Sequence, residues 1–284
     1  MLKRVIRGGL RRLATWLEAD PDENTPLPYE ADFAYPGLNR RLAGMIRDGF
    51  RVPYAWGMLQ GAALADALGV ERISVVEFGV AGGNGQVAME QIAERLEQQY
   101  DVRIDIYGFD TGAGLPAVTD VRDVPNLAST GLYKMDEGKL RERLHRARLV
   151  LGDIKETMTG FLKSKPAPLA FLACDLVLYT STTSALRLLE ADEGLLLPRI
   201  PCYFDDVLGF TFGDWNGERL AIHEFNAAHA TRKVSPFYGL RHYVPAQCFN
   251  DMWVEKFWLA HVFDHSRYGE RDHLVKQHNL ALAG

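Results

Sequence analysis

The segment from Ser74 to Gly85, Ser-Val-Val-Glu-Phe-Gly-Val-Ala-Gly-Gly-Asn-Gly, constrains the fold of this chain more than any other. Its β-branched residues run into a glycine-rich turn, where the backbone can bend tightly and a ligand can approach closely. The residues from Gln86 to Leu96 then have helical spacing. A strand, a glycine-rich turn and a helix form the first half of a βαβ unit, in which ligands bind at the carboxyl ends of the strands. We therefore expect a small polar ligand at this turn.

The remaining apolar runs predict an α/β fold with a doubly wound, mainly parallel sheet. Helical patterns precede the first strand at residues 42–46 and 56–68 and separate most of the later strands, which favours parallel pairing. The predicted parallel strands are Ile73–Phe78, Ile104–Phe109, Arg148–Leu151, Leu169–Cys174 and Cys202–Phe204. Two later runs, Arg219–Phe225 and Phe257–Phe263, are expected to close the sheet as a hairpin-like pair.

The first 31 residues differ in character from the rest of the chain. Five basic residues precede any acid among regularly spaced apolar side chains, which is typical of an amphipathic helix. Such an arm could lie on an anionic membrane surface, but packing on its own domain or on a second subunit of a homo-oligomer is the favoured interpretation. A proline-rich linker follows, so we expect an arm and linker at 1–31 and one folded domain at 32–284.

Composition excludes several classes of protein. The chain has 284 residues, 47% of them hydrophobic, and a formal net charge of -5, so nothing favours a nucleic-acid partner. Its three cysteines are too few and too scattered for a disulfide framework. Apolar runs fall short of the roughly 20 residues that cross a bilayer. We expect a cytoplasmic protein.

Two cofactor classes fit the glycine turn. The residues from Gly83 to Ala88 match the dinucleotide fingerprint G-x-G-x-x-A, but in that fold the first glycine follows the strand directly. Here Glu77 lies at the approach to the turn, where its charge would repel a pyrophosphate. S-adenosylmethionine carries an ammonium and a sulfonium and no phosphate, so an acidic site suits it better. Asp110, at the end of the second strand, can accept hydrogen bonds from both ribose hydroxyls.

The chain resembles the class I S-adenosylmethionine-dependent methyltransferases, and among them the macrocin O-methyltransferase-like family. The matching segments, spread over roughly residues 70–265, are 77–85, Phe109-Asp110 with Gly114-Leu-Pro116, Asp175 with Leu178-Tyr179 and Ser181-Thr182, and Phe204-Asp205-Asp206. The resemblance implies a seven-stranded Rossmann-like sheet and S-adenosylmethionine as the cofactor. It also implies a set of cofactor-binding residues, namely Glu77, Gly79, Ala81, Gly83, Asp110, Thr111, Asp153 and Asp175. For Asp153, which would bind the adenine amine, the alternative is a helix N-cap. For Glu77 the alternative is an acid that only supports the structure of the turn.

Three carboxylates form a second group of candidates. Asp175 ends one predicted strand and Asp205 and Asp206 end the next, so on neighbouring strands they would lie close together. Close acids repel one another unless a cation lies between them, and oxygen ligands without histidine or cysteine favour Mg²⁺. The alternative is that Asp205 and Asp206 only cap a turn and that Asp175 binds a backbone amide. The chain departs from the family pattern at two places. It has Val177 where the family often has a second acid after Asp175. It has Gly112 and Ala113 before Gly114-Leu-Pro116, where the family usually has an aromatic residue and an acid.

The sequence thus predicts an S-adenosylmethionine-dependent O-methyltransferase for a small-molecule hydroxyl acceptor, with Mg²⁺ assistance as a further expectation. The candidate catalytic residues are His229, His223 and Asp175. Two alternatives stay open at this point. One is an NAD-dependent oxidoreductase that uses the turn at Gly83, and the other is a catalytically silent interaction subunit that keeps the glycine turn without an acceptor site.

Overall fold

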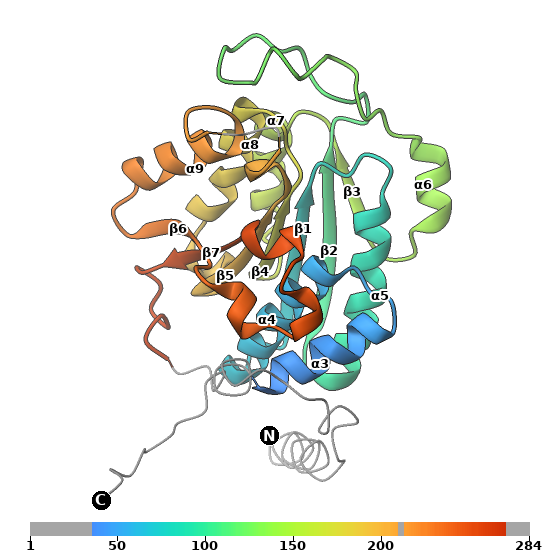
Figure 1. The fold of residues 1–284 in the computed structure, drawn as a ribbon, viewed down its shortest axis with the longest axis vertical. Coiled ribbons are helices and arrows are strands. Elements are labelled where there is room, and N and C mark those ends of the chain that lie inside the picture. The colour runs from blue at the N-terminus through green and yellow to red at the C-terminus, as the bar shows by residue number, and fades with distance from the viewer. Residues whose placement is uncertain (1–35, 210–212, 271–284) are drawn as a thin grey trace, which may run out of the picture.

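A seven-stranded sheet forms the centre of the molecule (Figure 1). The computed structural model describes residues 36–209 and 213–270. The strand order is β3-β2-β1-β4-β5-β7-β6, with parallel pairing from β3 to β5 and antiparallel pairing of β7 with β5 and β6. The strands are β1 (Arg72–Phe78), β2 (Arg103–Asp110), β3 (Arg148–Leu151), β4 (Leu169–Cys174), β5 (Arg199–Phe204), β6 (Arg232–Pro236) and β7 (Phe257–Val262). The predicted fold class, a mainly parallel seven-stranded sheet, is confirmed.

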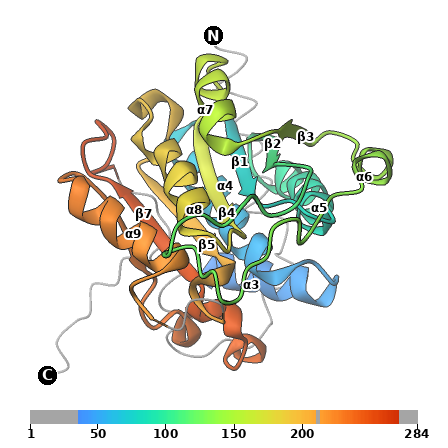
Figure 2. The same ribbon diagram turned by 90° about the horizontal axis from the view of Figure 1, so that it is seen from above.

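Helices cover both faces of this sheet (Figure 2). On one face, α4 packs against β1, β4 and β5 and contacts its neighbours α3 and α5. On the other face, α7, α8 and α9 lie side by side. The bounds are α3 (Pro36–Arg47), α4 (Val52–Leu68), α5 (Asn84–Gln99), α6 (Glu137–Arg143), α7 (Ile154–Lys163), α8 (Tyr179–Leu186) and α9 (Gly217–Ala228). Short 3₁₀ helices are η1 (Arg187–Glu190), η2 (Glu193–Leu195), η3 (Asp205–Val207), η4 (Leu240–Tyr243), η5 (Ala246–Cys248) and η6 (Met252–Glu255).

The central strands are apolar because both of their faces are covered. All six residues of β4 are buried, and so are six of the seven residues of β1. Strands buried on two sides are continuously hydrophobic rather than alternating. The chain leaves β1 toward β2 on one side, whereas β4 lies on the other side, so the strand order reverses between β1 and β4. A crevice opens at such a reversal, outside the carboxyl ends of the strands.

A long segment between β2 and α6, residues 111–136, crosses the carboxyl ends of the strands, where Figure 1 shows it in green at the top. Asp123 anchors it to the start of α8, since its carboxylate accepts hydrogen bonds from the backbone N–H of Thr180 at 2.8 Å and from the Thr180 hydroxyl at 3.0 Å. The Arg122 side chain lies over the Tyr179 ring and donates to its hydroxyl at 2.9 Å. The segment is thereby fixed above the crevice.

One predicted strand is wrong. The run Arg219–Phe225 lies within the helix α9, and the strand that pairs with β7 is β6 at Arg232–Pro236. The buried residues of α9 include Glu218, Ala221, Ile222 and Phe225, whose spacing of three and four is that of one helical face. The predicted strand Phe257–Phe263 is confirmed as β7.

The predicted arm at residues 1–31 and the start of the domain at residue 32 lie outside the described residues. Within the described ranges, none of the helices is long and apolar enough to cross a bilayer.

Candidate functional site

A cavity of about 510 Å³ opens at the carboxyl ends of the strands. Its wall is formed by the glycine turn after β1, the ends of β2, β4 and β5, the first turn of α7, the start of α8 and the segment 111–136. The charged residues that line it are five aspartates and one lysine, namely Asp110, Asp153, Asp175, Asp205, Asp206 and Lys155. Such a wall attracts cationic ligands and repels phosphates.

Two backbone N–H groups of the turn after β1 donate hydrogen bonds to Asp110. The carboxylate Oδ2 of Asp110 accepts from the backbone N–H of Val80 at 3.0 Å and of Ala81 at 2.9 Å, and Oδ1 accepts from Gly112 at 2.7 Å. Ala81 adopts a positive φ of 44°, which non-glycine residues rarely do and which is a form of strain that clusters at functional sites. The donors that would bind a pyrophosphate are therefore already bound to a carboxylate.

Glu77 lies beneath the glycine turn and is only 2% exposed. The Tyr54 hydroxyl donates to its Oε1, and the Gln86 amide donates to its Oε2 at 2.8 Å. Burial raises the pKa of Glu77 to about 7, because the charged form loses more to desolvation than these two hydrogen bonds return. Glu77 is not among the residues that line the cavity. The resemblance assigned Glu77 to the cofactor, whereas in the structure its side chain supports the turn from below.

The glycines of the turn serve different purposes. A Cβ on Gly79 would lie 2.1 Å from the carbonyl oxygen of Asp175, so only glycine lets the loops after β1 and β4 approach this closely. Gly83 has a φ of 77°, and its Cβ would lie 2.0 Å from a methyl group of Leu140. Gly85 lies inside α5 against the Glu77 carboxyl. Gly79 and Ala81 line the cavity, whereas Gly83 packs away from it.

The dinucleotide fingerprint at 83–88 does not form a phosphate loop. Gly83 is the N-cap of α5, and the rest of the motif belongs to the first turns of that helix. In a dinucleotide-binding fold, the pyrophosphate binds at the N-terminus of this helix. Here the buried Glu77 carboxyl lies beside the N-terminal turn of α5. This arrangement disfavours the oxidoreductase interpretation on electrostatic grounds.

Thr111 and Asp153 both line the cavity beside Asp110. The Thr111 hydroxyl donates to the carbonyl of Gly114 at 2.7 Å and accepts from the N–H of Ala113 at 3.1 Å, so it shapes the start of the segment over the crevice. Asp153 is the N-cap of α7, since its carboxylate accepts from the N–H of Lys155 at 2.7 Å. The N-cap alternative is therefore realised, in a residue that also faces the cavity.

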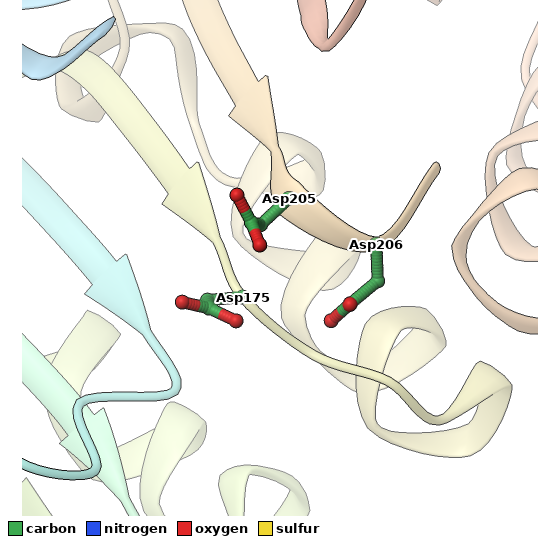
Figure 3. Close-up of side chains that lie close together, drawn as sticks. All are labelled: Asp175, Asp205 and Asp206. Carbon is green, nitrogen blue, oxygen red and sulfur yellow. The ribbon is translucent and has the colours of Figure 1, made fainter. Parts of the chain in front are cut away.

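Asp175, Asp205 and Asp206 come together as the sequence predicted (Figure 3). Asp175 follows β4, and the other two follow β5, which is hydrogen-bonded to β4. One oxygen atom from each carboxylate lies within 4.8 Å of the other two. Figure 3 shows the three side chains converging on a common space.

The charges of this acid cluster are only partly compensated. Both the Tyr203 hydroxyl, at 2.6 Å, and the Lys256 ammonium, at 3.1 Å, donate to Oδ1 of Asp205. Desolvation and the nearby Asp205 charge raise the pKa of Asp175 to about 6. Desolvation and the charges of Asp175 and Asp205 raise the pKa of Asp206 to about 7. Within the described residues, Oδ2 of Asp206 is buried and has no hydrogen-bond partner.

Glu218 is a fourth carboxyl group here that the sequence analysis missed. It lies in the first turn of α9 with 0% exposure, and burial together with the Asp206 charge raises its pKa well above the usual range. In the sequence it is one acid at the start of a helix, where acids are common because they interact favourably with the helix dipole. Lys256 was missed for a similar reason, since one lysine before a strand predicts only a solvated charge.

The two histidines proposed as bases are not in the site, which corrects that prediction. His223 is exposed on α9 beside Trp215. His229 ends the same helix, stacks on Phe225 and bonds to the Phe225 carbonyl through Nδ1 at 2.8 Å. Among the described residues, no histidine lines the cavity. Of the three catalytic candidates, Asp175 alone faces it.

Val177 lines the cavity and also packs into a small hydrophobic cluster with Val124, Ala128 and Leu178. This cluster joins the segment 111–136, which contributes Val124 and Ala128, to the residues just before α8. Tyr179 packs and bonds to Arg122 and Glu224 outside the cavity lining. Five residues with hydroxyl groups also line the cavity, namely Thr119, Tyr133, Thr180, Ser181 and Ser184.

Comparison with known proteins gives likenesses among solved structures only. No family model matches the chain, and no curated protein matches it. The calicheamicin methyltransferase CalS11 is 22% identical with a TM-score of 0.49, over 72% of this chain and 88% of that one. The O-methyltransferase NovP is 15% identical with a TM-score of 0.46, over 80% and 97%. The Podospora anserina methyltransferase PaMTH1, bound to S-adenosylhomocysteine (SAH), is 14% identical with a TM-score of 0.38, over 88% and 95%.

The fold follows from the topology of the chain itself. Five parallel strands lie in the order β3-β2-β1-β4-β5, and β7 is inserted antiparallel between β5 and β6. In the described part of the chain, helices cover both faces of this sheet. The crevice between β1 and β4 contains the glycine turn, the acid after β2 and the acids after β4 and β5. This chain therefore has the fold of the class I S-adenosylmethionine-dependent methyltransferases.

Proposed function

We propose that this chain is an S-adenosylmethionine-dependent O-methyltransferase that acts on a hydroxyl group of a small molecule, a sugar or another natural product, with help from a divalent cation such as Mg²⁺. One observation carries the proposal. The two N–H groups of the glycine turn already bind the Asp110 carboxylate, and the cavity beyond is lined by five aspartates against one lysine. A phosphate-bearing cofactor would find these two N–H groups occupied and would face an excess of negative charge, whereas a cationic one meets complementary charge.

The cofactor would bind along the turn and the end of β2. When bound, S-adenosylmethionine supplies a methyl group on a positively charged sulfur. Asp110 retains lone pairs for the ribose hydroxyls, because a carboxylate has about four accepting positions and three are used here. Asp153 lies on the α7 side of the same cavity, within the part of the wall where the resemblance assigns the adenine.

The acid cluster fits a hard divalent cation. The atoms that could bind the cation are all carboxylate oxygens, and their negative charge is incompletely compensated. Oδ2 of Asp206 is also a buried hydrogen-bond acceptor without a partner among the described residues. Because Tyr203 and Lys256 both bind Oδ1 of Asp205, its other oxygen remains for the cation. A cation held there would lower the pKa of an acceptor hydroxyl and so favour its nucleophilic form.

The proton of the acceptor also needs a destination. Asp175 faces the cavity, and one of its two carboxylate oxygens could accept the proton while the other binds the cation. The hydroxyl groups of Thr180, Ser181 and Ser184 on α8 can hydrogen-bond a polyhydroxylated acceptor beside it. A hydroxyl-bearing acceptor therefore suits this end of the cavity.

Ligand-induced stabilisation tests the proposal. SAH should raise the melting temperature of the full chain, whereas NAD⁺ should not, because only a ligand that binds the folded state stabilises it. A shift with NAD⁺ alone would refute the methyltransferase proposal and favour an oxidoreductase. The absence of a shift with either ligand would favour the silent interaction subunit.

A further inference from the structure

One buried carboxyl group connects the two loops that form the acid cluster. The side chain of Glu218, in the first turn of α9, accepts a hydrogen bond from the N–H of Asp206 at 2.8 Å through Oε2. Its other oxygen, Oε1, accepts from the N–H of Leu176 at 3.4 Å. Leu176 directly follows Asp175 after β4, and Asp206 belongs to the loop after β5. Glu218 therefore holds the backbone of both loops from below.

The same helical turn also reaches the segment over the crevice. The N–H of Gly217 donates to the carbonyl of Arg122 at 2.9 Å, within residues 111–136. Thus Gly217 and Glu218 connect three elements of the cavity wall, while neither residue lines the cavity. A carboxyl group with 0% exposure is costly for a fold to bury. An apolar side chain would fill the space at lower cost but would leave both N–H groups without an acceptor.

A second observation concerns the direction of the Asp206 side chain. Its backbone is held by Glu218, its side chain is 5% exposed, and its Oδ2 has no partner among the described residues. Oxygen atoms of Asp175, Asp205 and Asp206 lie within 4.8 Å of one another. The backbone contact to Glu218 thus fixes Asp206 while its side-chain oxygen stays available.

We propose that Glu218 is a positioning residue for the cation site, which sets the separation of Asp175 and Asp206 without touching cation, cofactor or acceptor. This inference rests on the proposed function, because it takes the acid cluster as the cation site. Partners that orient metal ligands from outside the coordination shell commonly contribute 10- to 100-fold to metal affinity. Glu218 acts in this way through two backbone N–H groups rather than through the ligand side chains.

The substitution Glu218→Gln tests the proposal. An amide has one accepting oxygen, so either Leu176 or Asp206 loses its hydrogen bond while side-chain volume is kept. We expect the affinity for Mn²⁺, a paramagnetic substitute for Mg²⁺ that is followed by electron paramagnetic resonance, to fall about 10- to 100-fold. The affinity for SAH, measured by calorimetry, should stay within about twofold, because the cofactor end has no contact with Glu218. Glu94→Gln, on the exposed side of α5, is the matched control and should change neither affinity.

The possible outcomes separate the inference from the proposed function. If the unmodified protein binds no Mn²⁺, the cation site fails and the role of Glu218 fails with it. If the unmodified protein binds Mn²⁺ and Glu218→Gln binds it equally well, only the role of Glu218 is refuted. Equal losses of Mn²⁺ and SAH affinity would also refute it, because they indicate general disruption. Should the glutamine variant not fold, Glu218→Asp, which keeps the carboxyl group but is too short to reach both N–H groups, must show the same selective loss of Mn²⁺ affinity.

Discussion

The substitution Glu77→Gln should stabilise the protein at alkaline pH and not at acidic pH. Glu77 is 2% exposed beneath the glycine turn, and burial raises its pKa to about 7 from an ordinary value of 4.5. Between these two pH values the folded chain binds more protons than the unfolded chain, so the free energy of unfolding falls as pH rises. Each pKa unit corresponds to about 1.4 kcal/mol, so the rise from 4.5 to about 7 gives a limiting penalty of about 3.5 kcal/mol well above pH 7. Most of it, about 2.5 kcal/mol, develops between pH 5 and pH 8.

Glutamine resembles the protonated acid and cannot ionise, so it removes this penalty. Its Oε1 can still accept from the Tyr54 hydroxyl. Its Nε2 can donate to Gln86 Oε1, a buried acceptor without a hydrogen-bond partner among the described residues, once the Gln86 amide, whose Nε2 now faces Glu77, turns over. Urea unfolding of both proteins at pH 5 and pH 8 measures the effect. The difference in the free energy of unfolding between the variant and the unmodified chain should grow by about 2.5 kcal/mol from pH 5 to pH 8. For Glu94→Gln the corresponding difference should not change. An equal effect of Glu77→Gln at both pH values would refute the reasoning, because Glu77 would then be charged throughout.

Three further predictions concern the turn, the end of β2 and the acid cluster. Gly85→Ala puts a Cβ 1.8 Å from Glu77 Oε1, so it should lower the free energy of unfolding by about 2 kcal/mol or more in thermal unfolding. Gly82 has open space around it, so Gly82→Ala should be nearly neutral in the same assay. Asp110→Asn leaves one accepting oxygen for the turn and the ribose and should weaken SAH binding about tenfold in calorimetry; an unchanged affinity would remove Asp110 from the cofactor site. Because the pKa of Asp206 is raised to about 7, protons compete with a cation for its carboxylate below that pH. The affinity for Mn²⁺ should therefore rise from pH 5.5 to pH 8, and an affinity that does not change with pH would contradict the cation site.

The sheet was predictable where apolar runs are long and bounded by turns. The strand predicted at Leu169–Cys174 is correct to the residue, because a strand buried on both faces is a continuous apolar run. The sequence of β6, Arg-Lys-Val-Ser-Pro, has one fully buried residue and no such signal. Arg219–Phe225 was mistaken for a strand because a short apolar run does not distinguish a buried strand from a helical face.

The site was predictable where it depends on strand ends, and less so where it depends on side-chain direction. Asp175 and Asp206 meet because β4 and β5 are neighbours, which alternation of strands and helices already indicates. Glu77 ends up beneath the turn because Tyr54 on α4 provides a hydrogen bond to it, and that contact joins residues far apart in the sequence. The contacts of Glu218 to Leu176 and Asp206 are likewise tertiary, so a sequence pattern does not reveal them.

A crystal structure of the full chain with SAH tests the central claim most directly. The account predicts density for the ligand in the cavity, with the ribose hydroxyls on Asp110 and the sulfur directed toward Asp175. A ligand bound elsewhere, or a pyrophosphate-bearing nucleotide bound across Val80 and Ala81 in place of the Asp110 carboxylate, would contradict it.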